Sequence, residues 1–71
     1  MDKVVVFSDV SARDGIGIEV YIDEELALEI FRDDAKKTKT VSLYKDNFPL
    51  DKLEHYIALF KKGIRTDFIK V

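Results

Sequence analysis

The sequence predicts an α+β domain in which a four-stranded antiparallel meander (β-β-β-β-α) is followed by one C-terminal amphipathic helix packed across one face of the sheet. Two observations predict this fold. Apolar and polar residues alternate along the first two thirds of the chain, which is the period of half-buried strands. From Pro49 the apolar spacing changes to three and four residues, the period of an amphipathic helix. With 71 residues and no cysteine, residues 1–71 form a single domain held together by packing alone.

Four segments are expected to form the strands. They are Lys3–Ser8, Ile16–Ile22, Leu26–Arg32 and Thr38–Lys45. The first is rich in β-branched residues and leads into a cluster of turn formers. The second alternates most cleanly, because Ile18 and Val20 share one face with the flanking isoleucines while Glu19 and Tyr21 lie on the other.

Short connections join these segments, so each strand is expected to pair with its sequence neighbour. We expect a three-residue connection at Asp23–Glu25 and a four-residue connection at Asp34–Lys37, both common hairpin lengths. Matching the apolar faces sets the register, because a slip of one residue would turn every core side chain outward. The predicted apolar pairs are Val4–Val20, Val6–Ile18, Ile22–Leu26, Val20–Leu28, Ile18–Ile30, Ile30–Val41 and Leu28–Leu43.

A single apolar stripe predicts the helix, which is expected to be roughly fourteen residues long, near the average for globular proteins. The stripe consists of Leu50, Leu53, Ile57, Phe60 and Ile64. Pro49 suits the first helical position, where its missing N–H would be unpaired anyway, and an alternative start places Asp51 at the N-cap. Gly63 is expected to end the helix in a left-handed conformation, with Ile64 touching Leu59. Residues 66–71 form either a short fifth strand or an extended arm.

One helix can cover only one side of the sheet, and the register predicts an unusual composition for the other side, which we name the aromatic face. There Phe7 and Phe31 flank Gly17, and Tyr21 and Tyr44 flank the small Ala27. An exposed apolar patch of a few hundred Å² usually marks an interaction site. Either the C-terminal residues cover this patch, or the aromatic pairs only stiffen the sheet, or a partner binds there. The candidate interface residues are Val5, Phe7, Glu19, Tyr21, Glu29, Phe31 and Tyr44.

Two like charges are predicted to oppose each other on the aromatic face, at Glu19 and Glu29. Paired carboxylates can bind a cation, accept a basic side chain of a partner, or act as acid and base. We favour instead that both side chains splay into water, because acid–base chemistry needs a cleft and an open sheet offers none. In a homodimer joined face to face, the two glutamate pairs would meet, so such a dimer needs a displaced register or Lys3 as a counter-charge.

The net charge of −2 conceals a strong asymmetry. Residues 1–35 carry ten acidic and three basic side chains, whereas residues 36–71 carry nine basic and four acidic ones. A basic corner is predicted at one end of the molecule, formed by Lys36, Lys37, Lys39, Lys61, Lys62 and Arg65. An acidic end is predicted opposite, formed by Asp23, Glu24, Glu25 and Asp46. These charges either complement the helix dipole and keep the turns soluble, or steer a partner of opposite charge.

No catalytic, metal-binding or cofactor-binding pattern is found. His55 is the only histidine and has Asp51 as its sole obvious helper, so we expect a half-exposed residue at the edge of the apolar stripe and no metal. The stretch RDGIG lacks the lysine and hydroxyl residue of a phosphate-binding loop. No apolar run approaches the roughly 20 residues of a membrane-spanning helix, and no secretory signal is recognised.

We therefore expect a small non-enzymatic binding or regulatory domain of the cytoplasm, acting by contact with a protein partner or as a homodimer. The contact would use the aromatic face or an edge strand. One alternative is a binder of single-stranded nucleic acid on the same face, which is disfavoured because base-stacking platforms are electropositive and these aromatics surround two glutamates. The other alternative is an acidic inhibitor or immunity-type protein that presents its acidic end to a basic enzyme.

Overall fold

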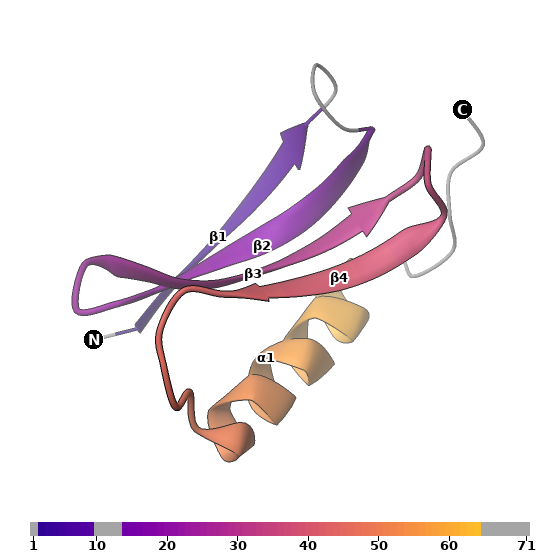
Figure 1. Cartoon of the computed structure of the whole chain (residues 1–71). Coiled ribbons are helices and arrows are strands. Elements are labelled where there is room, and N and C mark those ends of the chain that lie inside the picture. The colour runs from indigo at the N-terminus through magenta and orange to yellow at the C-terminus, as the bar shows by residue number, and fades with distance from the viewer. Residues whose placement is uncertain (1, 10–13, 65–71) are drawn as a thin grey trace.

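The computed structural model describes residues 2–9 and 14–64 and confirms the predicted α+β meander (Figure 1). Its strands are β1 (Asp2–Asp9), β2 (Gly15–Ile22), β3 (Glu25–Asp33) and β4 (Thr38–Leu43), followed by the helix α1 (Leu50–Gly63). The strands form one antiparallel sheet in the order β1-β2-β3-β4. Figure 1 shows α1 on one side of this sheet. The predictions for residues 66–71 lie outside the described residues.

Most of the predicted register is confirmed. Six of the seven apolar pairs form as expected: Val4–Val20, Val6–Ile18, Val20–Leu28, Ile18–Ile30, Ile30–Val41 and Leu28–Leu43. The four-residue turn between β3 and β4 is also confirmed, because Asp33 pairs with Thr38 across it.

The connection between β2 and β3 differs from the prediction. It has two residues, Asp23 and Glu24, and both have left-handed backbone conformations with φ of 51° and 71°. Two such residues make a type I′ turn, whose twist matches that of the strands it joins. Ile22 therefore pairs with Glu25, and the predicted Ile22–Leu26 pair is wrong.

A β-bulge beside this turn restores the predicted register further along the strands. Val20 pairs with Leu28 but the next residue, Tyr21, pairs with Leu26, which leaves Ala27 as the extra residue of β3. Bulges bend a strand and re-aim its side chains. Leu26 is only half-buried and is not part of the core cluster of the described residues, contrary to its predicted place on the core face.

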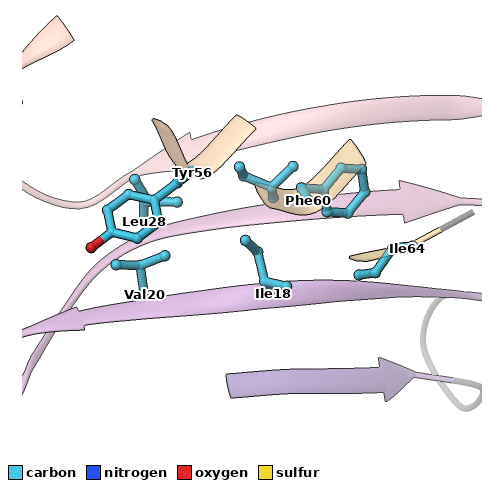
Figure 2. Close-up of a cluster of buried hydrophobic side chains, with 7 residues drawn as sticks. Ile18, Val20, Leu28, Tyr56, Phe60 and Ile64 are labelled. Atoms are coloured by element: carbon cyan, nitrogen blue, oxygen red, sulfur yellow. The ribbon is translucent and has the colours of Figure 1, made fainter. Parts of the chain in front are cut away.

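The core lies between α1 and the two central strands. Figure 2 shows side chains of the helix pointing toward side chains of β2 and β3. The buried cluster consists of Ile18, Val20, Leu28, Ile30, Tyr56, Phe60 and Ile64. Partly buried side chains pack around it, namely Ile16, Ile22, Phe48, Leu53 and Ile57. Leu50, the first residue of the predicted stripe, is exposed because it lies at the very start of the helix.

Both helix ends differ in detail from the prediction. Pro49 occupies the N-cap position, one residue before its predicted place, and Asp51 lies inside the first turn. Gly63 is the last helical residue and is not left-handed; the chain leaves the helix at Ile64 in extended conformation, with φ of −124°. The Ile64 N–H donates to the Phe60 carbonyl oxygen at 2.9 Å. The predicted ending is wrong because the Ile64 side chain enters the core.

Candidate interaction surface

The centre of the aromatic face is buried. Phe31 is only 1% exposed, so this candidate interface residue is not accessible to a partner. The Phe7 ring stacks on it with ring centroids 5.7 Å apart. Between them Gly17 leaves the space that the Phe31 ring occupies, since a Cβ there would lie 3.0 Å from Phe31 Cδ1 and collide with the Ile30 carbonyl oxygen. The predicted approach of Phe7 and Phe31 at Gly17 is therefore confirmed.

The two glutamates do face each other, as the register predicted. Each accepts a hydrogen bond from a tyrosine hydroxyl: Tyr21 Oη donates to Glu19 Oε1 at 3.3 Å, and Tyr44 Oη donates to Glu29 Oε2 at 3.4 Å. Burial, followed by the nearby Glu19 carboxylate, raises the pKa of Tyr21. Glu29 is buried, so the expectation that both side chains splay into water is wrong for this residue.

The outer part of the aromatic face stays accessible. Val5, Phe7, Glu19 and Tyr21 are half-buried, and Tyr44 is exposed. The structure therefore divides the seven predicted interface residues into a buried centre, Glu29 and Phe31, and an accessible margin. Sequence reasoning could not separate the two groups, because alternation assigns a side chain to a face and does not reveal how neighbouring rings cover it.

A hollow of about 930 Å³ opens on this side of the sheet, beside the edge strand β1. Its lining residues are Lys3, Val5, Tyr21, Asp23 and Glu24. The first three lie on the aromatic face of β1 and β2, and the two acids form the type I′ turn. The expectation that the sheet offers no cleft is therefore wrong. Neither Glu19 nor Glu29 is among these lining residues, so the hollow does not lie at the two opposed glutamates.

Apolar side chains are also exposed on the helix side of the sheet, on both edge strands. They are Val4 and Val6 of β1 and Val41 and Leu43 of β4. The apolar alternation predicted a core position for all four. They are exposed because a helix about 10 Å across covers only two strands spaced about 4.8 Å apart. Each pair of exposed side chains lies along a strand that has a neighbour on one side only within the described sheet.

One flank of α1 is tied to the start of β1. The Tyr56 hydroxyl donates to the Asp2 carboxylate, and Lys52 Nζ lies 3.6 Å from Asp2 Oδ2. Burial, followed by the hydrogen bond to Asp2, raises the pKa of Tyr56 to about 12, and the same hydrogen bond lowers the pKa of Asp2. Leu59 is exposed and lies seven residues after Lys52, on the same helix flank. Sequence reasoning missed this polar link.

Charged side chains at the C-terminal end of β3 are buried and contact one another. Arg32 Nε lies 3.0 Å from Asp34 Oδ1, and Arg32 Nη2 donates to Asp34 Oδ2 at 3.2 Å, with both side chains almost fully buried. The Asp34 N–H donates to the Asp14 carbonyl oxygen at 2.6 Å, and the Lys36 N–H donates to Asp33 Oδ1 at 3.0 Å. These contacts hold the turn between β3 and β4.

The predicted basic corner is described except for Arg65. Lys36, Lys37, Lys39, Lys61 and Lys62 are exposed. Figure 1 shows the end of α1 and the turn between β3 and β4 toward the same end of the sheet. Asp33 and Asp34 at that turn are buried, so their carboxylates do not form part of the exposed charge pattern.

The single histidine and the possible metal ligands of the described residues can be placed in the structure. His55 is exposed, not half-exposed as predicted, and contacts the Tyr56 ring edge-on with centroids 5.1 Å apart. Within residues 2–9 and 14–64, no three histidine, aspartate or glutamate side chains come together as metal ligands. The single helix of this part of the chain is neither long nor apolar enough to cross a membrane.

Comparison of the chain with protein-family models, with curated proteins and with solved structures found no match. Function is therefore inferred from the surfaces described above.

Proposed function

We propose that this protein is a small non-enzymatic binding module that acts by protein–protein contact at the margin of its sheet. One observation carries the proposal: the exposed large apolar side chains of the strands gather on the two edge strands, at Val4, Val6, Val41 and Leu43. An edge strand presents unpaired backbone donors and acceptors beside these side chains. A polypeptide satisfies both at once, because it supplies backbone hydrogen bonds and apolar contact together.

The aromatic margin supports the same proposal. Tyr44 follows the last residue of β4 and is exposed, while Val5 and Tyr21 line the hollow beside β1. Tyrosine is enriched at protein interfaces because a large apolar ring and a polar hydroxyl suit a surface that changes from wet to dry. A cytoplasmic location belongs to the proposal, since a chain without cysteine gains nothing from an oxidising compartment.

The observations favour neither alternative. A binder of single-stranded nucleic acid needs a positive groove along its aromatic platform. Here the hollow has one lysine and two acids in its described lining, and the tyrosine hydroxyls are directed to glutamates. An inhibitor would act through the acidic end, where Glu25 is exposed but its carboxylate already pairs with Lys45 Nζ at 2.9 Å, and no exposed apolar side chain of the described edge strands belongs to that end.

The test is a panel of single lysine substitutions at exposed positions. Val6→Lys, Val41→Lys and Tyr44→Lys probe β1, β4 and the aromatic margin, and Leu50→Lys is the matched control because it is an exposed apolar residue of the helix. Each variant is measured by light scattering for self-association, and by quantitative capture of proteins from host extract. Phe31 is a poor probe because a charge at a buried position would unfold the domain.

We expect at least one of the three sheet variants to abolish an association that the wild type and Leu50→Lys both retain. The proposal fails if the wild type is monomeric and retains no protein. It also fails if all four variants bind the same proteins equally well.

A further inference from the structure

The edge strand β1 exposes two apolar side chains, Val4 and Val6, on the helix side of the sheet. It has eight residues, lies at the end of the strand order, and pairs only with β2 among the described strands. Its centre is the run Val4–Phe7, without proline or an inward-pointing charge. Natural proteins usually protect such an edge with those devices, because an open apolar edge pairs with another strand.

We propose that β1 pairs antiparallel with β1 of a second copy, so that two molecules form one continuous eight-stranded sheet. This inference rests on the proposed function, because it names the partner that the β1 edge takes. A two-fold axis perpendicular to the sheet would keep both helices on the same side. Paired residues then point to the same face, which restricts the register to pairs whose numbers are both even or both odd.

Charge complementarity selects one register among these. With Val6 opposite Val6 at the axis, Lys3 of each copy lies opposite Asp9 of the other. An ion pair therefore forms at both ends of the seam, the line along which the two β1 strands pair. The same register places Val5 opposite Phe7, and pairs of a β-branched and an aromatic residue stabilise antiparallel strands. Moving the axis to Val5 would place Lys3 opposite Phe7 and lose both ion pairs.

The described surroundings of β1 fit this arrangement on both faces. On the helix side, Val6 is 61% exposed and would be covered by its symmetry mate, with the exposed Leu59 on the helix flank nearest the seam. On the aromatic side, Val5 lines the hollow. A Phe7 ring from the second copy would lie directly opposite Val5, within about 5.5 Å between Cβ atoms, and would cover that margin of the hollow.

The other routes to a dimer are weaker. Joining two copies through the aromatic face would bring together two Glu19–Glu29 pairs, whereas edge pairing keeps the glutamates of one copy apart from those of the other. The β4 edge has six residues from Thr38 to Leu43 and contains Lys39 but no acid. It therefore cannot form an ion pair with itself in any register.

The first test measures the mass of the full chain in solution by light scattering across a concentration series. We expect a dimer for the wild type and a monomer for Val6→Lys, because two lysines would meet at the axis. Val41→Lys is the matched control on β4 and should remain dimeric. Far-UV circular dichroism checks that all three are folded, and neither valine belongs to the buried core cluster.

A second test addresses the register through charge exchange. Lys3→Asp and Asp9→Lys are each expected to raise the dimer Kd by roughly tenfold, since each homodimer gains two like-charge pairs in place of two ion pairs. Mixing the two variants should restore wild-type affinity as a one-to-one heterodimer, because both ends of the seam are again complementary. A mixture that binds no more tightly than either variant alone would overturn the proposed pairing.

Failure of this inference can be distinguished from failure of the proposed function. A monomeric wild type overturns β1 pairing. The proposed binding module would still be supported if the wild type retained a different protein and one of the sheet variants lost it. A dimer that survives Val6→Lys but is lost in Tyr44→Lys likewise overturns β1 pairing and moves the contact to the aromatic margin.

Discussion

The central and the edge strands of this sheet carry the same kinds of apolar residue in the same cross-strand rows, yet they have opposite environments. Val20 of β2 is fully buried, whereas Val4, its partner on β1, is exposed. Ile30 of β3 is buried, whereas its partner Val41 on β4 is exposed. The difference arises because one helix covers two strands. Alternation along a strand therefore specifies which face a residue occupies, while the number of covering elements decides whether that face is dry.

The largest test of this contrast uses two leucines that pair with each other. Leu28 is 0% exposed and its partner Leu43 is 50% exposed. We expect Leu28→Ala to lower the free energy of unfolding by about 2–5 kcal/mol, because it leaves a cavity in the core. Leu43→Ala should lower the free energy of unfolding by less than about 1 kcal/mol. Urea denaturation followed by circular dichroism measures both, and equal losses would show that β4 is covered after all.

The second contrast concerns two ion pairs. The Arg32–Asp34 pair is buried, whereas the Lys45–Glu25 pair is largely exposed on the Glu25 side. Asp34→Ala is expected to lower the free energy of unfolding by about 3 kcal/mol, since it removes an anion beside a buried guanidinium. Glu25→Ala should change it by less than about 1 kcal/mol. The same urea titration measures both variants, and an Asp34→Ala loss as small as that of Glu25→Ala would refute the structural role of the buried pair.

The third contrast compares glycines. A Cβ at Gly17 would collide with the Ile30 carbonyl oxygen, whereas a Cβ at Gly63 would have no neighbour within 4 Å. Gly17→Ala is expected to lower the free energy of unfolding by about 1–3 kcal/mol, because β2 and β3 must move apart or Phe31 must shift. Gly63→Ala should raise it by up to about 1 kcal/mol through helix propensity. Thermal melting of the two variants should therefore shift the midpoint in opposite directions.

The smallest expected effect is a pH dependence of the free energy of unfolding. It arises from the hydrogen bond between Tyr56 of the core and Asp2 of the edge strand β1. Burial and the bond to Asp2 raise the pKa of Tyr56 to about 12, above its ordinary value of 10.0. The folded state therefore holds this proton more tightly than the unfolded state, and the resulting stability is complete below pH 10.0 and lost as the pH rises toward 12. Tyr56→Phe should flatten that alkaline decline in urea midpoints.

Tyr56→Phe should also change the acidic side of the same profile. The hydrogen bond from Tyr56 lowers the pKa of Asp2, so the stability it contributes is present above the ordinary value of 3.8 and lost as the pH falls through the lowered pKa. A variant whose midpoints follow the wild-type profile at both ends would show that the Tyr56–Asp2 bond has no energetic weight.

The sequence predicted the order of the elements and most of the pairing, because those features depend on local periodicity and on short connections. It failed at the turn after Ile22. The three-residue connection was expected because it places Ile22 opposite Leu26, and Asp23-Glu24 lacks the glycine that usually signals a two-residue type I′ turn. The bulge at Ala27 follows from that turn and could not be inferred without it.

The candidate surface was predicted less completely than the fold. The seven candidate residues do share one face, but burial of Glu29 and Phe31 depends on how neighbouring side chains lie over them in three dimensions. The exposed valines of β1 were assigned to the core because their alternation matches that of β2. The Arg32–Asp34 pair and the Tyr56–Asp2 bond join residues whose charge or polarity suggested a solvated role, and pattern alone carries no sign of such contacts.

The position of α1 after all four strands has a consequence for how the chain is made. Each strand pairs with the one synthesised just before it, so the described sheet can assemble as the chain grows. Its core side, however, stays open to water until Tyr56, Phe60 and Ile64 have been translated. During that interval Ile18, Val20, Leu28 and Ile30 of β2 and β3 are as exposed as the valines of the edge strands. The nascent protein is thus most vulnerable to aggregation just before its helix emerges, and a stalled or truncated product ending before residue 50 would be a sheet without a cover.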